Sequence, residues 1–282
     1  MEKWFLGFLC VSMTAGAAAA QENSIFTSKV GQYEVSLLVE TQGPGRPGVL
    51  IGAGQALLDQ YIPGSFTSET NTFLVRGGGK NILIDTGFGG AVFDHLKKLG
   101  LEPGDIDAVL LTHMHGDHIG GLARDGKALF PRAQVYVAEA EKNYWTISHI
   151  NQGAVAALAP YGGRVKTFIP GELGAGGTEL VPGITPIAAY GHTPGHTVFL
   201  VRGGNEQFLV WGDLMHVELV QFPRPDISVT YDTDPAAAAR TRKAVLDYAA
   251  KNKIPAGGMH LVYPGVGIVR EEGSGYQFIH SK

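Results

Sequence analysis

The sequence predicts a single mixed α/β domain over residues 21–282, on three observations. Apolar runs of strand length alternate along the chain with segments of helix length. Glycine- and proline-rich stretches separate many of them, as expected of turns. The chain has 282 residues, of which 44% are hydrophobic and 17% charged, so it can fill one substantial core.

The expected strands are short and mostly apolar. They lie at residues 35–39, 71–75, 81–84, 108–111, 134–137, 184–189, 198–201, 208–211, 267–270 and 276–279. The second and third flank Gly77-Gly78-Gly79-Lys80, which predicts a hairpin. The run Ala108-Val109-Leu110-Leu111 indicates a buried strand, because it contains no polar side chain.

Three segments predict helices, at residues 91–99, 138–147 and 235–251. The first is closed by Gly100, a common residue at a helix end. The last has the clearest signal, since Asp234 can cap the helix and Pro235 suits its first position.

The first twenty residues differ from the rest in composition. Lys3 precedes an apolar stretch, and small residues ending in Ala18-Ala19-Ala20 follow it. This pattern is typical of a secretory signal peptide over residues 1–20, cleaved near Ala20, and predicts a periplasmic or secreted protein. A membrane anchor is the alternative, although the apolar stretch is short for a bilayer. Cleavage would remove Cys10, the single cysteine of the chain.

Four potential metal ligands lie within the six residues His113-Met114-His115-Gly116-Asp117-His118, directly after the expected strand 108–111. Residues two apart on an extended segment point the same way, so His113 and His115 can face one ion. We expect Gly116 to permit a turn that a side chain would resist, after which Asp117 and His118 can face a second ion. Imidazole suits zinc, and carboxylate suits zinc or a harder ion.

Three later segments offer further ligands. A turn-rich loop contains His192 and His196, Asp213 comes just after the apolar run 208–211, and His260 follows a short segment between glycines. Each of these residues alone would more often be an ordinary polar or core residue. Their order behind the first motif makes them candidate ligands.

In these ordered motifs the chain resembles the metallo-β-lactamase-fold hydrolases, roughly from residue 32 to the C-terminus. The resemblance implies a four-layer αβ/βα metallo-β-lactamase sandwich with a dinuclear centre. It assigns His113, His115 and His196 to one metal, Asp117, His118 and His260 to the other, and Asp213 to both. Two zinc ions are the expected cofactors, with manganese, iron or cobalt as alternatives.

The resemblance also implies residues around the ligands. Asp85 is expected to support a metal-binding histidine by hydrogen bonding, with a simple turn aspartate as the alternative. His192 is expected to hold its loop by hydrogen bonding. Trp145, Leu214, His216 and Phe222 are the expected lining of an apolar substrate pocket, although Trp145 and Phe222 suit the core equally well.

Residues 43–67 form a long excursion rich in glycine and proline. It also contains two apolar patches, Val49-Leu50-Ile51 and Ala56-Leu57-Leu58. The sequence leaves open whether this excursion is a lid over the metal site or a plain surface loop.

The implied chemistry is hydrolysis. Two cations about 3.5–4 Å apart hold a water between them and lower its pKa, so that hydroxide is the nucleophile. Asp117 is the candidate catalytic residue, positioning the hydroxide and passing a proton to the leaving group.

Residues 211–216, 220–223 and 231–235 resemble the secreted branch of methyl parathion and organophosphate hydrolases. Members of that branch commonly hydrolyse lactones and aryl esters as well as phosphotriesters. The leading expectation is therefore a secreted dinuclear zinc hydrolase of lactones or related esters, with phosphotriesterase activity as a side reaction. A primary organophosphate hydrolase, a β-lactamase and a non-catalytic metal-binding module are the alternatives.

The expected partner is a small neutral ester, lactone or phosphotriester. The net charge of −4 and the lack of a lysine- or arginine-rich run argue against nucleic acid. No membrane contact is expected after signal cleavage, and a homodimer is compatible with the sequence.

Overall fold

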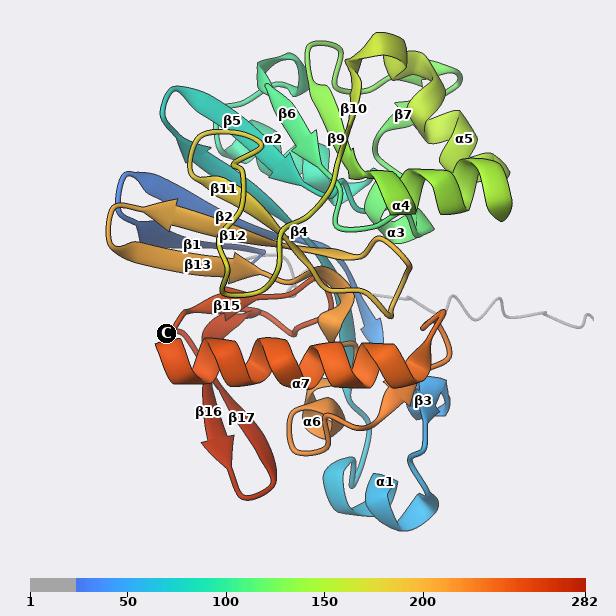
Figure 1. Ribbon diagram of the computed structural model, residues 1–282, viewed down its shortest axis with the longest axis vertical. Coiled ribbons are helices and arrows are strands. Elements are labelled where there is room, and N and C mark those ends of the chain that lie inside the picture. Colours follow the sequence, from blue (N-terminus) through green and yellow to red (C-terminus); the bar gives the residue numbers. More distant parts are fainter. Residues whose placement is uncertain (1–23) are drawn as a thin grey trace, which may run out of the picture.

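Two β-sheets pack face to face, with helices on the outer side of each (Figure 1). This computed structural model describes residues 24–282, so the expected signal peptide lies outside the described residues. The arrangement is the four-layer αβ/βα sandwich that the sequence resemblance implied, which confirms that prediction.

The first sheet has the strand order β1-β2-β4-β5-β6-β9-β10. Its strands are β1 (Ile25–Val30), β2 (Tyr33–Pro44), β4 (Thr67–Gly77), β5 (Lys80–Ile84), β6 (Ala108–Leu110), β9 (Gln134–Ala138) and β10 (Val165–Phe168). The first four strands in this order pair antiparallel, and β5, β6, β9 and β10 run parallel. A small separate hairpin joins β7 (Ala123–Arg124) to β8 (Lys127–Ala128).

The second sheet has the order β11-β12-β13-β15-β16-β17. Its strands are β11 (Ile184–Ala188), β12 (Thr197–Gly203), β13 (Glu206–Val210), β15 (Ala256–Gly257), β16 (Val266–Glu272) and β17 (Gly275–His280). All neighbours pair antiparallel except β13 and β15.

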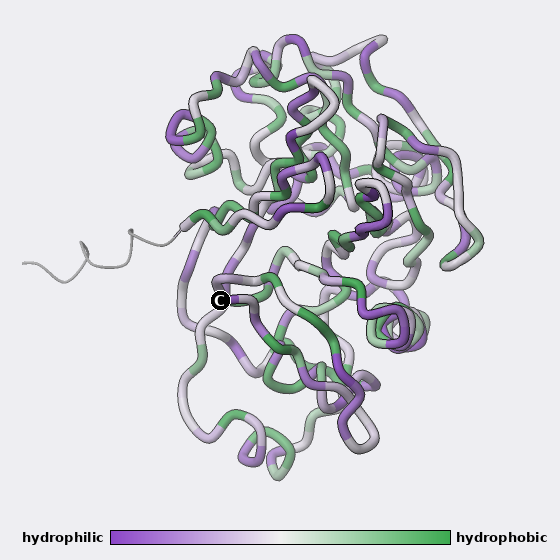
Figure 2. The backbone as a smooth tube through the Cα atoms, turned by 90° about the vertical axis from the view of Figure 1, so that its left-hand side faces the viewer, coloured by the Kyte–Doolittle hydropathy of each residue, from purple (hydrophilic) through white to green (hydrophobic). Residues whose placement is uncertain are grey.

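Side chains that alternate along the strands divide the core into layers. Leu37 on β2 packs between the two sheets, while its neighbour Leu38 packs under the helices of the first sheet. Phe199 on β12 likewise faces the first sheet, and Leu200 faces the helix of the second. Because strand residues point alternately to opposite faces, strands buried on both faces are apolar throughout. Figure 2 shows hydrophobic and hydrophilic stretches following one another along the chain.

The helices cover the outer faces (Figure 1). The first sheet is covered by α2 (Ala91–Lys98), α3 (Gly116–Ile119), α4 (Glu139–Asn143) and α5 (Gln152–Leu158), and the second by α7 (Pro235–Asn252). A π-helix, Tyr144–Ser148, continues the chain from α4, where the sequence predicted one uninterrupted helix. Asp234 caps α7 by accepting a hydrogen bond from the Ala237 amide, as expected. Among the described residues, no helix has both the length and the apolar character needed to cross a membrane.

The excursion between β2 and β4 contains local structure of its own. It includes a 3₁₀ turn (Pro47–Val49), β3 (Leu50–Ile51) and α1 (Gln55–Tyr61), and β3 pairs with β14 (Ser228–Val229). Its apolar side chains pack with residues near α6 (Glu218–Gln221) in a cluster apart from the main core. The excursion therefore packs as a small separate cluster on the same side of the molecule as the second sheet.

Candidate metal centre

The candidate ligands lie at the carboxyl ends of strands from both sheets. His113 follows β6 of the first sheet, and His115 directly precedes the short helix α3, which contains Asp117 and His118. The second sheet contributes the other three, from loops after β11, β13 and β15: His192, Asp213 and His260. The packing of one sheet on the other therefore assembles the site.

Three imidazole nitrogens converge in the first ligand group. His113 Nε2 lies 3.0 Å from His115 Nδ1, and His192 Nε2 lies 3.1 Å from the former and 3.0 Å from the latter. Asp213 Oδ2 is 3.3 Å from His192 Nε2 and 3.6 Å from His113 Nε2. These four residues can hold one cation.

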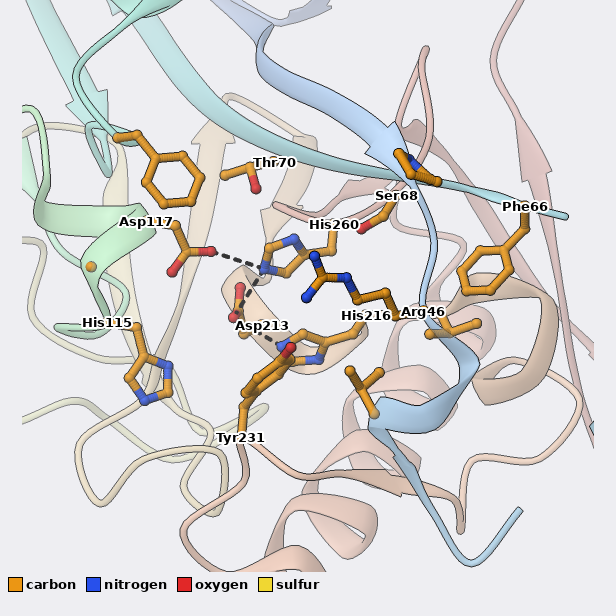
Figure 3. Close-up of a pocket in the computed structure, with 15 residues that line it drawn as sticks. Arg46, Phe66, Ser68, Thr70, His115, Asp117, Asp213, His216, Tyr231 and His260 are labelled. Carbon is orange, nitrogen blue, oxygen red and sulfur yellow. Dashed lines mark hydrogen bonds and ion pairs between the residues drawn. The ribbon is translucent and has the colours of Figure 1, made fainter. Parts of the chain in front are cut away.

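The second ligand group lies beside the first and shares Asp213 with it (Figure 3). His118 Nε2 is 3.2 Å from Asp213 Oδ1 and 3.6 Å from Asp117 Oδ2. His260 Nε2 is 3.4 Å from Asp117 Oδ2 and 3.2 Å from Asp213 Oδ2. A carboxylate common to both groups suits two neighbouring cations.

Hydrogen bonds on the outer nitrogens orient these rings. His118 Nδ1 donates to Asp85 Oδ2 at 2.7 Å, and His260 Nδ1 donates to the Glu69 carbonyl at 2.7 Å. His192 Nδ1 donates to Asp232 Oδ1 at 2.8 Å. In its neutral form, each of these rings directs the lone pair of its Nε2 into the site, as metal-binding histidines do.

Two buried atoms of the seven candidate ligands have no hydrogen-bond partner among the described residues. They are His118 Nε2 and Asp213 Oδ1, which face each other. Lone pairs that converge in a buried space repel unless a cation or proton lies between them. The donor set of imidazoles and carboxylates fits two zinc-like cations.

His115 of the first group and His260 of the second differ in their affinity for protons. Burial lowers the pKa of His115 to about 3, with the neighbouring His192 adding to the effect, so the ring is neutral at pH 7. Burial also opposes a charge on His260, but the carboxylates of Asp213 and Asp117 outweigh it and raise the pKa to about 9. A cation that binds the second group therefore displaces protons.

His196 does not occupy the position that the sequence resemblance assigned to it. Its Nδ1 donates to the Ala189 carbonyl at 2.9 Å, and its Nε2 accepts the Asp213 amide at 3.0 Å. Both ring nitrogens are thus engaged, and His192 completes the first group instead. The roles expected of His192 and His196 are therefore reversed. His192 is the candidate ligand, and His196 stabilises its loop and accepts a hydrogen bond from the backbone amide of Asp213.

The sequence did not indicate a role for Glu141. Its buried carboxylate accepts hydrogen bonds from the Met114 amide (2.9 Å), the Trp145 indole (2.6 Å), the Thr193 hydroxyl (2.7 Å) and the Gly195 amide (2.9 Å). It therefore ties the loop of His113 and His115 to that of His192. No local pattern distinguishes it from the other acids of its helix.

A cavity of about 490 Å³ opens over the candidate ligands (Figure 3). The excursion contributes part of its wall, and other elements supply the rest. The lining is Pro44, Arg46, Val49, Phe66, Ser68, Thr70, Phe88, His115, Gly116, Asp117, Asp213, His216, Val217, Tyr231 and His260. The excursion is therefore part of the pocket rather than a remote surface loop.

Of the four residues expected to line this pocket, His216 does so. Its Nε2 is 3.1 Å from Asp213 Oδ2, and its ring stacks on His260. Leu214 and Phe222 instead lie in the core beneath α7, where the Phe222 ring stacks on Phe278. Trp145 donates to Glu141 and lines a different cavity.

Comparison with known proteins gives one family. The model described as the metallo-beta-lactamase superfamily matches residues 67–253. The solved structure of hydrolase AbOPH in the beta lactamase superfamily has a TM-score of 0.83 at 30% identity and covers 93% of this chain and 99% of that one. AidC, a dizinc quorum-quenching lactonase in complex with its product, an N-acyl-L-homoserine, has a TM-score of 0.81 at 25% identity, with 92% and 98% covered.

Curated relatives match over shorter stretches. The atrochrysone carboxyl ACP thioesterase of Passalora fulva is 39% identical over 95 residues, which are 31% of this chain and 27% of that protein. Metallo-beta-lactamase domain-containing protein 1 of Xenopus laevis is 27% identical over 160 residues, 54% of this chain and 65% of that protein. The chain thus spans about a quarter of the first relative and just under two thirds of the second.

Proposed function

Because the chain belongs to the metallo-beta-lactamase superfamily, we propose that it is a dinuclear zinc hydrolase of lactones or related small esters. The observation that supports this most directly is the pair of ligand groups joined by Asp213. The similarity to AidC, a dizinc lactonase, supports both the metal and the substrate class. Phosphotriester cleavage is proposed as a side activity of the same centre.

Two zinc ions, when bound, would lower the pKa of a shared water and polarise the carbonyl of the ester. The chain's own residues provide the remaining functions. His113, His115 and His192 would hold one ion, Asp117, His118 and His260 the other, and Asp213 both.

Asp117 is the proposed catalytic residue. Its side chain retains 22% exposure toward the cavity, while its Oδ2 faces His118 and His260. That position lets the carboxylate orient the attacking water, accept its proton and return the proton to the leaving alcohol.

The pocket walls support a small substrate of mixed polarity. Phe66, Val49 and Phe88 offer apolar surface, and Tyr231 and Thr70 offer hydroxyl groups for a carbonyl or amide. Arg46 is a cationic side chain in the wall and suits the carboxylate that lactone opening produces.

The test is turnover by purified, zinc-loaded protein of N-hexanoyl-homoserine lactone beside methyl parathion. We expect the lactone to have the larger kcat/KM. The opposite ranking would make phosphotriesters the primary substrates. Two bound metals with no turnover of either compound would overturn the proposal, and thioester and β-lactam substrates would then be the next to assay.

We also propose that the protein is exported and that residues 1–20 are removed. The composition of that segment supports this. N-terminal sequencing of the protein recovered from its native cells tests it: a mature chain that starts near Gln21 is expected, and a retained N-terminus in the cytoplasm would contradict it.

A further inference from the structure

A second cavity, of about 650 Å³, lies beside the metal-site pocket and is lined by α3, α5, the π-helix and the β7–β8 hairpin. Its lining is largely small or apolar and includes Ile119, Ala123, Trp145, Ala156, Ala157 and Pro160. Asp125 is its one charged carboxylate, and that residue is exposed. The surface thus suits a hydrocarbon group much better than a charged one.

The two cavities meet at the metal motif itself. His115 and Gly116 line both of them. The His115 ring packs edge-on against Trp145 at a centroid distance of 5.4 Å, which places the indole on the side of the second cavity. The reacting centre and the apolar cavity are therefore separated by one imidazole and one glycine.

Gly116 is not needed for the backbone turn, contrary to the sequence expectation. Its φ is not positive, and a Cβ built on it would meet no atom within 4 Å. Because Gly116 has no side chain, the space beside it, where the two cavities meet, stays open. A larger residue there would narrow this passage.

We propose that the second cavity binds the apolar acyl chain of the substrate, while the scissile ester lies at the metals. The chain would cross above Gly116 and extend along Ala156 and Ala157 of α5. This inference rests on the proposed function and narrows it to substrates with an extended hydrocarbon tail. The energetic basis is burial of methylene groups, so affinity rises with chain length until the cavity is full.

A filling mutation and a matched control on the same helix test the assignment. Ala156 is exposed and lines the cavity, whereas Gln152 is exposed on α5 and does not line it. The kcat/KM values for N-butanoyl- and N-dodecanoyl-homoserine lactone are measured for the unaltered protein, Ala156→Phe and Gln152→Phe. We expect the unaltered protein to favour the long chain at least tenfold, Ala156→Phe to lose most of that preference through KM, and Gln152→Phe to keep it.

The ring-opened products give a readout that does not require turnover. Calorimetry compares the binding of N-dodecanoyl- and N-butanoyl-homoserine to the zinc-loaded proteins. Tighter binding of the long chain that Ala156→Phe abolishes and Gln152→Phe preserves supports the cavity assignment, even where the lactones are not hydrolysed and the proposed function fails. Equal affinity for both products, or a preference that Ala156→Phe leaves intact, overturns the assignment even where short lactones are hydrolysed.

Discussion

The two walls of the metal-site pocket are built differently. On the ligand side, His113, His118 and Asp213 are almost fully buried. Hydrogen bonds to Asp85, Asp232 and the Glu69 carbonyl fix three of the ligand histidines. On the excursion side, the wall residues are half-buried or exposed and pack in their own small cluster. The fold therefore fixes the candidate metal ligands in a buried, hydrogen-bonded network. Contacts with the substrate fall partly to the excursion, whose side chains are less constrained.

This contrast has a physical reason. Buried carboxylates and imidazoles have a high desolvation cost, which only complete hydrogen bonding or a metal offsets. The ligand side must therefore satisfy its polar atoms by hydrogen bonds or, at His118 Nε2 and Asp213 Oδ1, by a bound cation. Apolar contacts of the excursion have no such directional requirement, so substitutions there change shape without leaving a buried charge unpaired.

Removal of the shared carboxylate gives the largest expected effect, because it weakens both ligand groups at once. For Asp213→Asn we expect loss of bound zinc and a fall in kcat/KM of about 10³-fold or more, since metal stabilisation of the transition state is worth several kcal/mol. Elemental analysis and lactone kinetics measure this. Asp226→Asn, an exposed change, is the control. An Asp213→Asn protein with two zinc ions and a tenth of the activity would refute the shared role.

Substitution of His192 and of His196 should affect zinc content differently, because only His192 is a candidate ligand. His192→Asn removes a ligand of the first group, so we expect about one zinc per chain. His196→Asn removes a support of the Asp213 backbone, so we expect two zinc ions at high metal concentration and activity lowered about 10–100-fold, typical of lost ligand support. Zinc titration followed by elemental analysis checks both. The reverse pattern would restore the sequence-based assignment.

Substitution of Glu141 tests whether protein stability and zinc binding depend on the buried hydrogen bonds that link the two ligand loops. In Glu141→Gln an amide donor replaces an acceptor beside the donors of Thr193 and Gly195. We expect a loss of about 1–3 kcal/mol in unfolding free energy, measured by denaturation, and weaker zinc binding by the first group. Glu139→Gln, an exposed change on the same helix, is the control. Unchanged stability and zinc affinity would show that the tie is dispensable.

The smallest expected effect on the metals comes from the excursion. Phe66→Ala removes an apolar wall residue but no ligand or buried polar contact. We expect KM for the lactone to rise about threefold to tenfold with zinc content unchanged, because the lost contact is worth about 1 kcal/mol. Gln60→Ala, exposed on α1 and outside the pocket, is the control. Loss of zinc in Phe66→Ala would contradict the proposal that the excursion contributes only to substrate binding.

The sequence predicted much of this molecule because its strongest signals are local. The apolar runs predicted ten of the seventeen strands of the described residues, and Asp234 with Pro235 predicted the start of α7. The sequence did not predict the edge strands β1 and β10 or the helix α5. It also missed the two-residue strands β3, β7, β8, β14 and β15, since such short or polar segments take their structure from pairing with neighbours.

The errors at the site have a different origin. His192 and His196 flank the same turn, and spacing alone cannot say which ring faces inward, because hydrogen bonds to Asp232 and Ala189 decide it. Leu214 follows Asp213 directly, yet its side chain faces the core beneath α7. Apart from Trp145, the hydrogen-bond partners of Glu141 are more than twenty residues away in sequence, on loops that only the fold brings together.

The ligands stretch from His113 to His260, which places metal loading late in the life of a newly made chain. A growing chain exposes His113, His115, Asp117 and His118 long before His260 exists, so early capture of a cation would be partial and weak. The complete centre forms only after the second sheet has docked on the first, a step of high contact order. Metal uptake then selects molecules that have already folded.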